Sequence, residues 1–310
     1  MTTLTAIDGT PASSLCFGCM QFGGTADETA SRAMFDACRA AGVTFFDTAH
    51  VYTDGRSETM LGSFAEPERD GLVIATKANY ARGAGRENIL GSLDDSRKRL
   101  GTEVIDLLYL HRWDAETPLE ESFEALAKLK DQGTIRYVGV SNFAAWQVMK
   151  AQAVAATFGI RIDAIQPMYN LVKRQAEVEI LPMARDQDIA VVPYSPLGGG
   201  LLSGKYARGG SGRLTRDDRY AARYAPDWMH DAARGLADLA DEVGMHPATL
   251  AVAWVAANPA VTAPIVSARD ADQLGPSLAA ADVALDDDLL ARITALSPAP
   301  PPATDRLEEA

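Results

Sequence analysis

The sequence predicts an α/β protein that folds as a single (β/α)8 TIM barrel, with the active site at the C-terminal ends of its strands. Short strand-like runs alternate with helix-like segments along the whole chain. No Pro/Ser-rich linker or break in composition divides the 310 residues, a length that suits one such barrel. We expect the barrel to span residues 1–297, and the Pro-rich and then charged segment 298–310 to form a flexible C-terminal tail.

The expected strands are apolar runs bounded by turn residues, at 15–20, 44–48, 72–77, 105–111, 137–141, 164–167, 189–194 and 263–267. Segments of helical periodicity lie between them, such as 28–41 and 88–100. The segment Thr117-Pro118-Leu119-Glu120 predicts a helix with Thr117 as its N-cap, and Gly133 predicts where that helix ends. A long Gly- and Arg-rich loop, 198–226, is expected after the seventh strand, and its length favours a functional role.

Composition and charge exclude several classes of protein. The chain is 47% hydrophobic and 23% charged, which is typical of a globular protein. A net charge of −13 argues against general binding to nucleic acid or to anionic membranes. The N-terminus has no signal peptide pattern, and no apolar run is long enough to span a bilayer. We therefore expect a cytoplasmic protein with neither nucleic acid nor membrane as a partner.

The cysteine and histidine patterns predict no metal site. Cys16 and Cys19 form a C-x-x-C, but they lie in a predicted strand, where residues three apart point to opposite faces. None of the four histidines stands in an H-x-x-H or H-E-x-x-H arrangement.

The segment GGLLSGK follows the seventh predicted strand and fits most of the phosphate-binding pattern G-x-x-x-x-G-K-[ST] of nucleoside triphosphatases. Tyr206 occupies the position where that pattern needs a Ser or Thr hydroxyl to hold Mg²⁺. The motif is therefore weak by itself, and the other strand ends decide what this loop does.

The ends of strands two to four bring four reactive side chains to one side of the barrel: Asp47 and Tyr52 in FFDTAHVY, Lys77 in VIATK and His111 in LLYLHRWD. A nearby ammonium favours the phenolate of a tyrosine, and a carboxylate keeps that ammonium charged, so Tyr52 is expected to serve as a general acid near neutral pH. His111 can hydrogen-bond to a substrate carbonyl oxygen. Together the residues suit carbonyl reduction. His50 has no partner at ligand spacing, and we expect a structural or solvent-facing role for it.

With these residues the chain resembles the aldo-keto reductases over nearly its full length, through GCMQFGG, GVTFFDTAHVYTDGRSETMLG, IATK, YLHRWD, GVSNF, IQPMYN and YSPLGGGLLSGKY. The resemblance implies an NAD(P)H-dependent oxidoreductase that reduces an aldehyde or ketone, with Tyr52 as proton donor assisted by Lys77, Asp47 and His111. It also implies a monomer as the default. The alternative is a nicotinamide-binding redox-sensor or auxiliary protein with little turnover, because relatives that dock to channel subunits share a similar YSPL…GLLSGKY loop.

The resemblance further implies a cofactor site along the remaining strand ends. Its expected residues border the nicotinamide, contact its carboxamide or ring, or cover the phosphates and adenosine: Gly18, Met20, Asp47, Ser141, Asn142, Gln166, Tyr194, Ser195, Pro196, Leu197, Gly198, Gly200, Lys205, Ser267, Arg269 and Gln273. Pro276 and Ser277 replace the Glu and Asn usual in the family, which leaves the adenine contacts open.

NADPH is the expected cofactor and NADH the alternative, because Arg269, helped by Lys205, Arg208 or Arg213, can pair with a 2′-phosphate. Asp270 beside Arg269 weakens this expectation. We expect a substrate pocket lined by Met20, Tyr52, His111 and Trp113, with Tyr220, Tyr224 and Trp228 of the long loop as further candidates. No Arg or Lys cluster in the sequence indicates a phosphate or carboxylate on the substrate.

Overall fold

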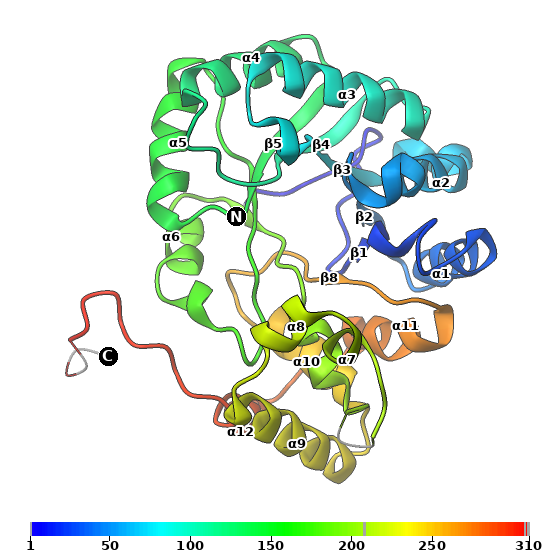
Figure 1. The fold of residues 1–310 in the computed structure, drawn as a ribbon, viewed down its shortest axis with the longest axis vertical. Coiled ribbons are helices and arrows are strands. Elements are labelled where there is room, and N and C mark those ends of the chain that lie inside the picture. The colour runs from blue at the N-terminus through cyan, green and yellow to red at the C-terminus, as the bar shows by residue number, and fades with distance from the viewer. Residues whose placement is uncertain (1, 207–208, 307, 309–310) are drawn as a thin grey trace.

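Eight parallel strands form the centre of the molecule in a computed structural model that describes residues 2–206, 209–306 and 308 (Figure 1). Hydrogen-bonded neighbours follow the order β7-β6-β5-β4-β3-β2-β1-β8. The strands are β1 Cys16–Gly18, β2 Phe45–Asp47, β3 Val73–Lys77, β4 Ile105–Leu110, β5 Ile135–Ser141, β6 Ala164–Gln166, β7 Ala190–Val191 and β8 Ile265–Val266. The backbone N–H of Ile265 donates to the carbonyl of Pro193 (2.9 Å) and joins β8 to the segment after β7. This (β/α)8 architecture confirms the predicted fold, although most strands are shorter than expected.

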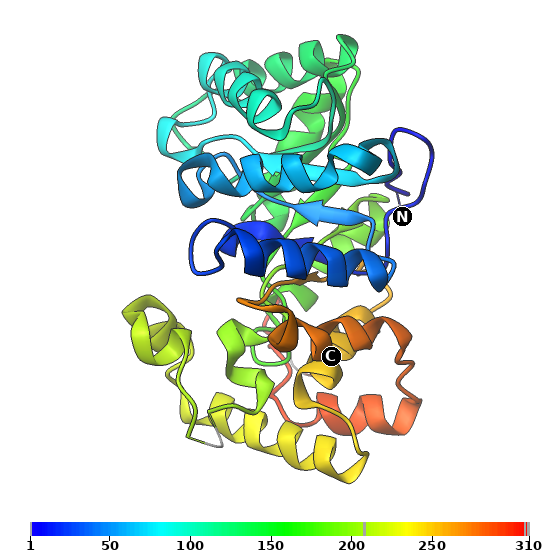
Figure 2. The same cartoon turned by 90° about the vertical axis from the view of Figure 1, so that its right-hand side faces the viewer.

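Helices cover the outside of the strands. They are α1 Glu28–Ala40, α2 Arg56–Ala65, α3 Arg86–Leu100, α4 Leu119–Asp131, α5 Ala145–Thr157, α6 Ile180–Asp186, α7 Arg213–Arg216, α8 Asp218–Arg223, α9 Asp227–Glu242, α10 Pro247–Ala256, α11 Ala271–Leu278 and α12 Asp287–Thr294. Figure 2 shows the helices of the C-terminal third (yellow to red) together at one end of the molecule, the cyan and green helices at the other end, and the blue helices between them.

Two sequence-based expectations about local structure were wrong. Helix α4 has Pro118 rather than Thr117 at its N-cap, because the hydroxyl of Thr117 donates to Asp114 (2.6 Å) and is not available to the helix. The segment 198–226 is not an open loop: its described residues form the 3-10 helix η6 (Gly198–Ser203) and the short helices α7 and α8. Gly133 does follow the end of α4, in a left-handed conformation with φ +70°.

The core consists of two layers, because alternate residues of each strand face opposite sides of the barrel wall. Cys16 and Phe45 belong to the smaller cluster, whereas Phe17 and Phe46 belong to the larger cluster that includes buried helical residues. Cys19 belongs to the larger cluster, so the two cysteines of the C-x-x-C lie in different layers. Both are buried free thiols, and burial raises their pKa values well above the usual range.

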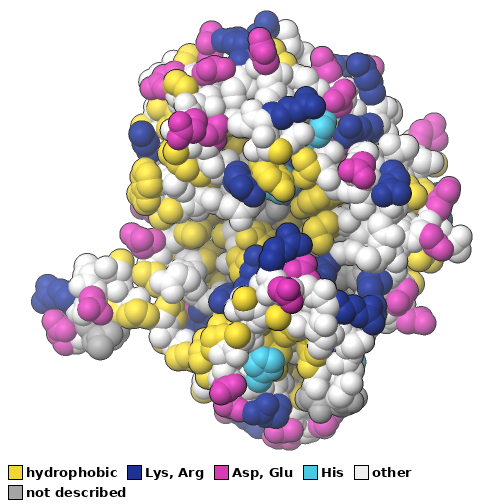
Figure 3. Space-filling model, in the orientation of Figure 1, with side chains coloured by type: hydrophobic (Ala, Val, Ile, Leu, Met, Phe, Trp, Pro, Cys, Tyr) yellow, Lys and Arg dark blue, Asp and Glu magenta, His cyan; other side chains and the backbone are white. Residues whose placement is uncertain are grey.

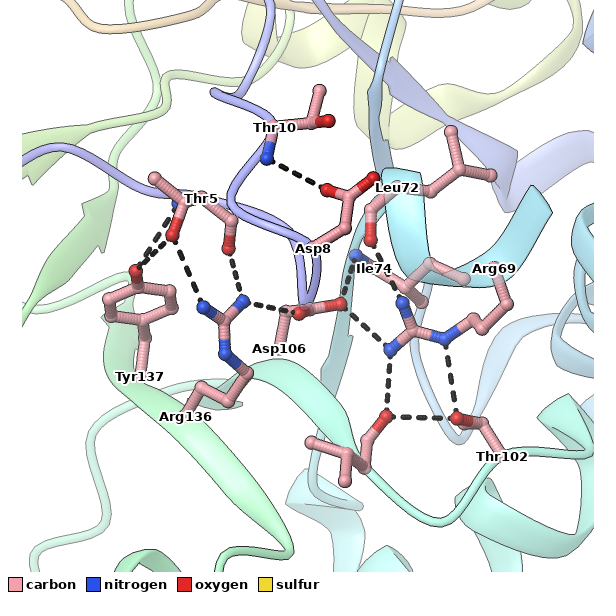
Figure 4. Close-up of polar contacts among 11 residues, drawn as sticks. Thr5, Asp8, Thr10, Arg69, Leu72, Ile74, Thr102, Asp106, Arg136 and Tyr137 are labelled. Carbon is pink, nitrogen blue, oxygen red and sulfur yellow. Dashed lines mark hydrogen bonds and ion pairs between the residues drawn. The ribbon is translucent and has the colours of Figure 1, made fainter.

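The N-terminal segment is tied to the strands by a buried carboxylate (Figure 4). Asp106 of β4 is fully buried and lies between two guanidinium groups, those of Arg69 (2.7 Å) and Arg136 (2.8 Å). Asp106 also accepts a hydrogen bond from the backbone N–H of Ile74 in β3 (2.9 Å), and Arg136 donates to the carbonyl of Thr5. Neighbouring strands and the N-terminal segment therefore share one ionic network.

Residues 298–306 form no helix or strand and run away from the barrel (Figure 1). The flexibility expected for the tail remains a prediction. Among the residues that the structure describes, none of the helices combines the length and apolarity that crossing a membrane requires.

The network around Asp106 predicts a large loss of stability when its carboxylate is removed. We expect Asp106→Ala to lower the free energy of unfolding by about 3–5 kcal/mol, because two guanidinium groups would keep their burial and lose their counterion. Urea unfolding followed by circular dichroism measures this change. Asp36→Ala is the control, because Asp36 pairs with Arg32 at the surface, where a pair contributes below about 1 kcal/mol. Similar small losses in both variants would contradict this account of the network.

Candidate active site

Four side chains meet at the C-terminal ends of strands β2 to β4. Asp47 ends β2, Lys77 ends β3, His111 follows β4 directly, and Tyr52 begins the 3-10 helix η2 (Tyr52–Gly55). The ammonium of Lys77 donates to Asp47 Oδ1 and to the carbonyl of Thr48 (2.7 Å). The Lys77 nitrogen lies 5.1 Å from the centroid of the Tyr52 ring, and the rings of Tyr52 and His111 pack edge to face at 5.9 Å. The barrel thus brings together the four residues that the sequence singled out.

The charges of Asp47 and Lys77 are buried and satisfied. Both side chains are almost completely buried, and Asp47 Oδ2 accepts a second hydrogen bond from the amide of Gln166 (2.9 Å). Burial raises the pKa of Asp47, and the ammonium of Lys77 opposes this shift only in part. Burial alone would lower the pKa of Lys77, but the charge and hydrogen bond of Asp47, together with Tyr52, outweigh it and raise that pKa. Lys77 therefore remains a cation at neutral pH, fixed beside Tyr52.

The side chains of Tyr52 and His111 are both neutral at physiological pH. Burial raises the pKa of Tyr52, and the ammonium of Lys77 lowers it by less, so the net shift is opposite to the one expected from sequence. Burial, followed by the positive charges of Lys77 and Arg112, lowers the pKa of His111 to about 3. Tyr52 is therefore a protonated phenol and His111 an uncharged imidazole.

A second set of residues braces the segment that carries Tyr52. Glu58 of α2 is fully buried and accepts hydrogen bonds from the hydroxyl of Thr76 (2.6 Å) and from Arg99 of α3 (3.0 Å). Arg99 also donates to the carbonyl of His50 (3.0 Å). Its guanidinium packs so closely against Gly55 that a Cβ there would lie 2.6 Å from it, and Gly55 has φ +87°. Glu58 lies within the motif GVTFFDTAHVYTDGRSETMLG, but no sequence pattern indicated Arg99.

His50 occupies a position next to the site without lining its cavity. Its Nε2 lies 3.2 Å from a carboxylate oxygen of Asp95, and its backbone N–H donates to the carbonyl of Lys77 (3.1 Å). This placement agrees with the structural role expected for His50. No group of three or more His, Cys, Asp or Glu side chains could hold a metal ion within the described ranges.

The ends of strands β5 to β7 contribute polar groups that fix one another. The hydroxyl of Ser141 donates to the carbonyl of Gln166 (3.0 Å), and the amide of Asn142 donates to the carbonyl of His111 (3.0 Å). The hydroxyl of Tyr194 donates to the side-chain oxygen of Asn142 (2.7 Å). These contacts link the strand ends to His111, and they leave the half-buried ring of Tyr194 at the rim.

The segment after Tyr194 is a glycine-rich turn around a lysine. Gly198, Gly199 and Gly200 have φ between +56° and +95°, a region that side chains rarely adopt, and Ser195 has φ +62°. A Cβ at Gly200 would lie 2.8 Å from the ammonium nitrogen of Lys205, so the absence of a side chain makes room for that group.

Lys205 belongs to a cluster of positive charges. Its pKa is lowered by burial and then by the charges of Arg269, Arg213 and Arg216. Arg208, which was also expected here, lies outside the described residues. Asp270 does not neutralise Arg269: its side chain accepts from the backbone N–H of Gln273 and caps helix α11.

The hydroxyl of Ser267, after β8, is buried and has no hydrogen-bond partner in the part of the chain that the structure describes. The side chain of Gln273 accepts a hydrogen bond from the backbone of Arg269 (3.1 Å). Gly18 ends β1, and a Cβ there would lie 2.7 Å from the side chain of Ile265, so close packing of β1 on β8 requires glycine.

A cavity of about 550 Å³ opens over Tyr52 and His111. It is lined by Met20, Val51, Tyr52, Thr53, Tyr80, His111, Arg112, Asn142 and Arg219. Trp113 is not among these residues: it packs on Phe143 (5.2 Å between ring centroids) and Trp146 (5.6 Å), and it lines an adjoining cavity of about 300 Å³.

The aromatic residues suggested for the long loop do not line the larger cavity either. Tyr224 is fully buried, Trp228 is exposed, and Tyr220 packs between the guanidinium groups of Arg213 and Arg223.

Sequence reasoning missed four polar residues of the larger cavity, Thr53, Tyr80, Arg112 and Arg219. Arg112 stands directly after His111 in YLHRWD, and this adjacency was the only available signal. Arg219 lies on α8, within a stretch where several arginines gave no indication of which one faces the site. No sequence pattern indicated an Arg or Lys cluster here, yet two arginines, Arg112 and Arg219, line the larger cavity.

Comparisons with known proteins agree with this geometry. The sequence profile described as "Aldo/keto reductase family" matches residues 14–298. The chain is 36% identical to the uncharacterized oxidoreductase YrpG of Bacillus subtilis (strain 168), over 94% of both chains. It is 35% identical to a probable voltage-gated potassium channel subunit beta of Oryza sativa subsp. japonica, over 89% of both. It is 32% identical to the L-glyceraldehyde 3-phosphate reductase of Escherichia coli (strain K12), over 75% of this chain and 73% of that protein. The chain therefore belongs to the aldo/keto reductase family.

Proposed function

We propose that this protein is an NADPH-dependent oxidoreductase that reduces an aldehyde or ketone to the alcohol, with Tyr52 as the proton donor. One observation carries the proposal: a protonated phenol and a neutral imidazole face the same cavity, and a buried lysine cation lies behind the phenol. This arrangement suits protonation of a carbonyl oxygen.

The residues around the rim fit a nicotinamide cofactor, which when bound supplies the hydride. The unpartnered buried hydroxyl of Ser267 and the glycine turn that holds Lys205 offer donors to phosphates. The positive cluster of Lys205, Arg213, Arg216 and Arg269 suits the additional phosphate of NADPH. Tyr194 would provide an aromatic face for the nicotinamide ring. The polar side chains of Ser141, Asn142 and Gln166 would contact the carboxamide of that ring.

The proton transfer follows from the charges of the site. The hydroxyl of Tyr52 donates its proton to the carbonyl oxygen, and the adjacent ammonium of Lys77 stabilises the phenolate that forms. Asp47 keeps Lys77 charged and oriented. The neutral imidazole of His111 hydrogen-bonds to the same carbonyl oxygen and orients the substrate. His111 directly follows the end of β4, whereas Tyr52 begins η2, which Glu58 and Arg99 brace.

The relatives support this function and also one alternative. L-glyceraldehyde 3-phosphate reductase is by its name a carbonyl reductase. The similarity to a probable potassium channel subunit beta supports the alternative of a cofactor-binding sensor or auxiliary protein with little turnover. The presence of Asp47, Tyr52, Lys77 and His111 together favours the enzyme. A small carbonyl compound is thus the proposed partner, and a cytoplasmic monomer remains our expectation.

The role of Tyr52 predicts a specific loss of chemistry. Tyr52→Phe should reduce the turnover of 4-nitrobenzaldehyde with NADPH by about 100-fold or more, because the proton donor is missing. NADPH binding, measured by quenching of its fluorescence, should stay near the wild-type level. Tyr80→Phe removes a hydroxyl from the same cavity and should keep most of the activity. If the unmodified protein binds neither NADPH nor NADH, both the enzyme and the sensor functions are excluded.

The lowered pKa of His111 predicts a flat pH profile. Because that pKa is about 3, the imidazole stays neutral from about pH 5 to pH 8, whereas an ordinary histidine titrates near pH 6.5. Tyr52 stays protonated over the same range, because burial raises its pKa. We therefore expect a constant kcat/KM for carbonyl reduction over this range. A break near pH 6.5 that disappears in His111→Gln would show that the imidazole titrates normally.

The positive cluster predicts which cofactor is preferred. Arg269→Ala should weaken NADPH binding by about tenfold or more and leave NADH binding nearly unchanged, because only NADPH carries the additional phosphate. Lys205→Ala should weaken both, because Lys205 lies against the glycine turn. Arg185→Ala, on the exposed surface of α6, is the charge-matched control. Equal weakening of both cofactors in Arg269→Ala would contradict this assignment.

A further inference from the structure

We propose that the cavity over Tyr52 takes a carbonyl substrate that carries an anionic group, a carboxylate or a phosphate, and that Arg112 binds this group. The inference rests on the proposed function and names its substrate class. It depends on how the charged side chains around the two adjoining cavities are paired.

Arg112 holds its guanidinium at the mouth of the site without a carboxylate. Its guanidinium carbon lies 4.1 Å from the centroid of the Tyr80 ring, so the aromatic face holds the group in place and leaves its N–H donors unused. No ion pair or hydrogen bond is made by its side chain among residues 2–206, 209–306 and 308. Guanidinium pairs bidentately with carboxylate and phosphate, and this one is available for such a partner.

The position of Arg112 relates it to the reacting carbonyl. Arg112 and His111 both contact the ring of Tyr80, since the His111 ring packs edge to face on it at 5.0 Å. These three residues line the cavity of about 550 Å³ and also the adjoining one of about 300 Å³. The anionic group would therefore bind near the Tyr80 ring, close to the carbonyl oxygen that His111 and Tyr52 would contact.

The surrounding charges favour an anion in the larger cavity. The chain carries a net charge of −13, yet none of the nine described residues that line this cavity is acidic. In the face seen in Figure 3, Lys and Arg side chains, with some Asp and Glu side chains beside them, lie around a central region of hydrophobic groups. A local positive charge in a concave site attracts anions that the rest of the surface repels.

Two other charged residues restrict where the anion can lie. Asp114 lines the smaller cavity, and hydrogen bonds from Thr117 and from the backbone of Ala84 lower its pKa, so it repels anions there. Arg219 lines the larger cavity, but its guanidinium already pairs with Asp217 (2.9 Å). Arg112 is therefore the main anion-binding group, and Arg219 contributes less.

Matched substrate pairs test this inference. We would compare 4-carboxybenzaldehyde with 4-nitrobenzaldehyde, and glyceraldehyde 3-phosphate with glyceraldehyde, using NADPH as reductant. The unmodified protein should prefer the acid of at least one pair, and the pair that shows the preference distinguishes carboxylate from phosphate. Arg112→Gln should lower kcat/KM for the preferred acid by about 10- to 100-fold, mainly through KM, and change that of its neutral counterpart by about twofold or less.

Arg82→Gln is the matched control, because Arg82 is an exposed arginine of the 3-10 helix η4 (Tyr80–Arg82), next to the site but outside both cavities. It should leave the preference for the acid unchanged. The inference is overturned if the unmodified protein does not prefer either acid, or if Arg112→Gln affects acid and neutral substrates alike.

A binding measurement separates this inference from the proposed function. Isothermal titration calorimetry would compare 4-(hydroxymethyl)benzoate with 4-(hydroxymethyl)benzamide, and inorganic phosphate with chloride, on the unmodified protein and on Arg112→Gln. Stronger binding of an anion that the substitution abolishes supports the site even if no aldehyde is reduced, in which case only the enzymatic function fails. Reduction of neutral aldehydes without such binding means that the function stands and the anion site does not.

Discussion

The ion pair between Asp47 and Lys77 is the constraint on which the site depends. Two charges that are nearly inaccessible to water are costly unless each is paired and hydrogen-bonded. Here the carboxylate also accepts from Gln166, and the ammonium also donates to the carbonyl of Thr48. The pair joins the neighbouring strands β2 and β3, whereas Gln166 lies on β6, so the complete set of hydrogen bonds needs strands that are not neighbours in the sheet. The polar environment of the positive charge beside Tyr52 therefore depends on the assembled barrel.

The surrounding structure keeps the phenol next to that charge. Arg99 connects Glu58 to the backbone at His50, and Gly55 leaves space for its guanidinium. Thr53 and Asp54, which follow Tyr52, have φ +47° and +56°, conformations that cost about 1 kcal/mol or more each for residues other than glycine. The fold thus holds a strained turn in place at the point where the phenol must be positioned.

The parts of the molecule that sequence could predict are those governed by a local period. Strand periodicity located the eight strands, and their ends located Asp47, Lys77 and His111. Contacts between distant segments had no such signal. The prediction of Thr117 as an N-cap was wrong because its hydroxyl donates to Asp114. The direction expected for the pKa of Tyr52 was wrong because burial exceeds the effect of Lys77. Arg112 was not identified because its packing on the Tyr80 ring has no sequence pattern.

The residues proposed to carry out the chemistry and those proposed to select the substrate lie in different parts of the barrel. Asp47 and Lys77 are the last residues of their strands, whereas Arg112 lies past the end of β4 and Arg219 lies on the short helix α8. A change at Asp47 or Lys77 disturbs the barrel interior, but a change at Arg112 or Arg219 disturbs only the rim. Under the proposed function, natural variation could therefore alter which carbonyl compound is accepted without rebuilding the proton-transfer residues, and the same freedom is open to a designer.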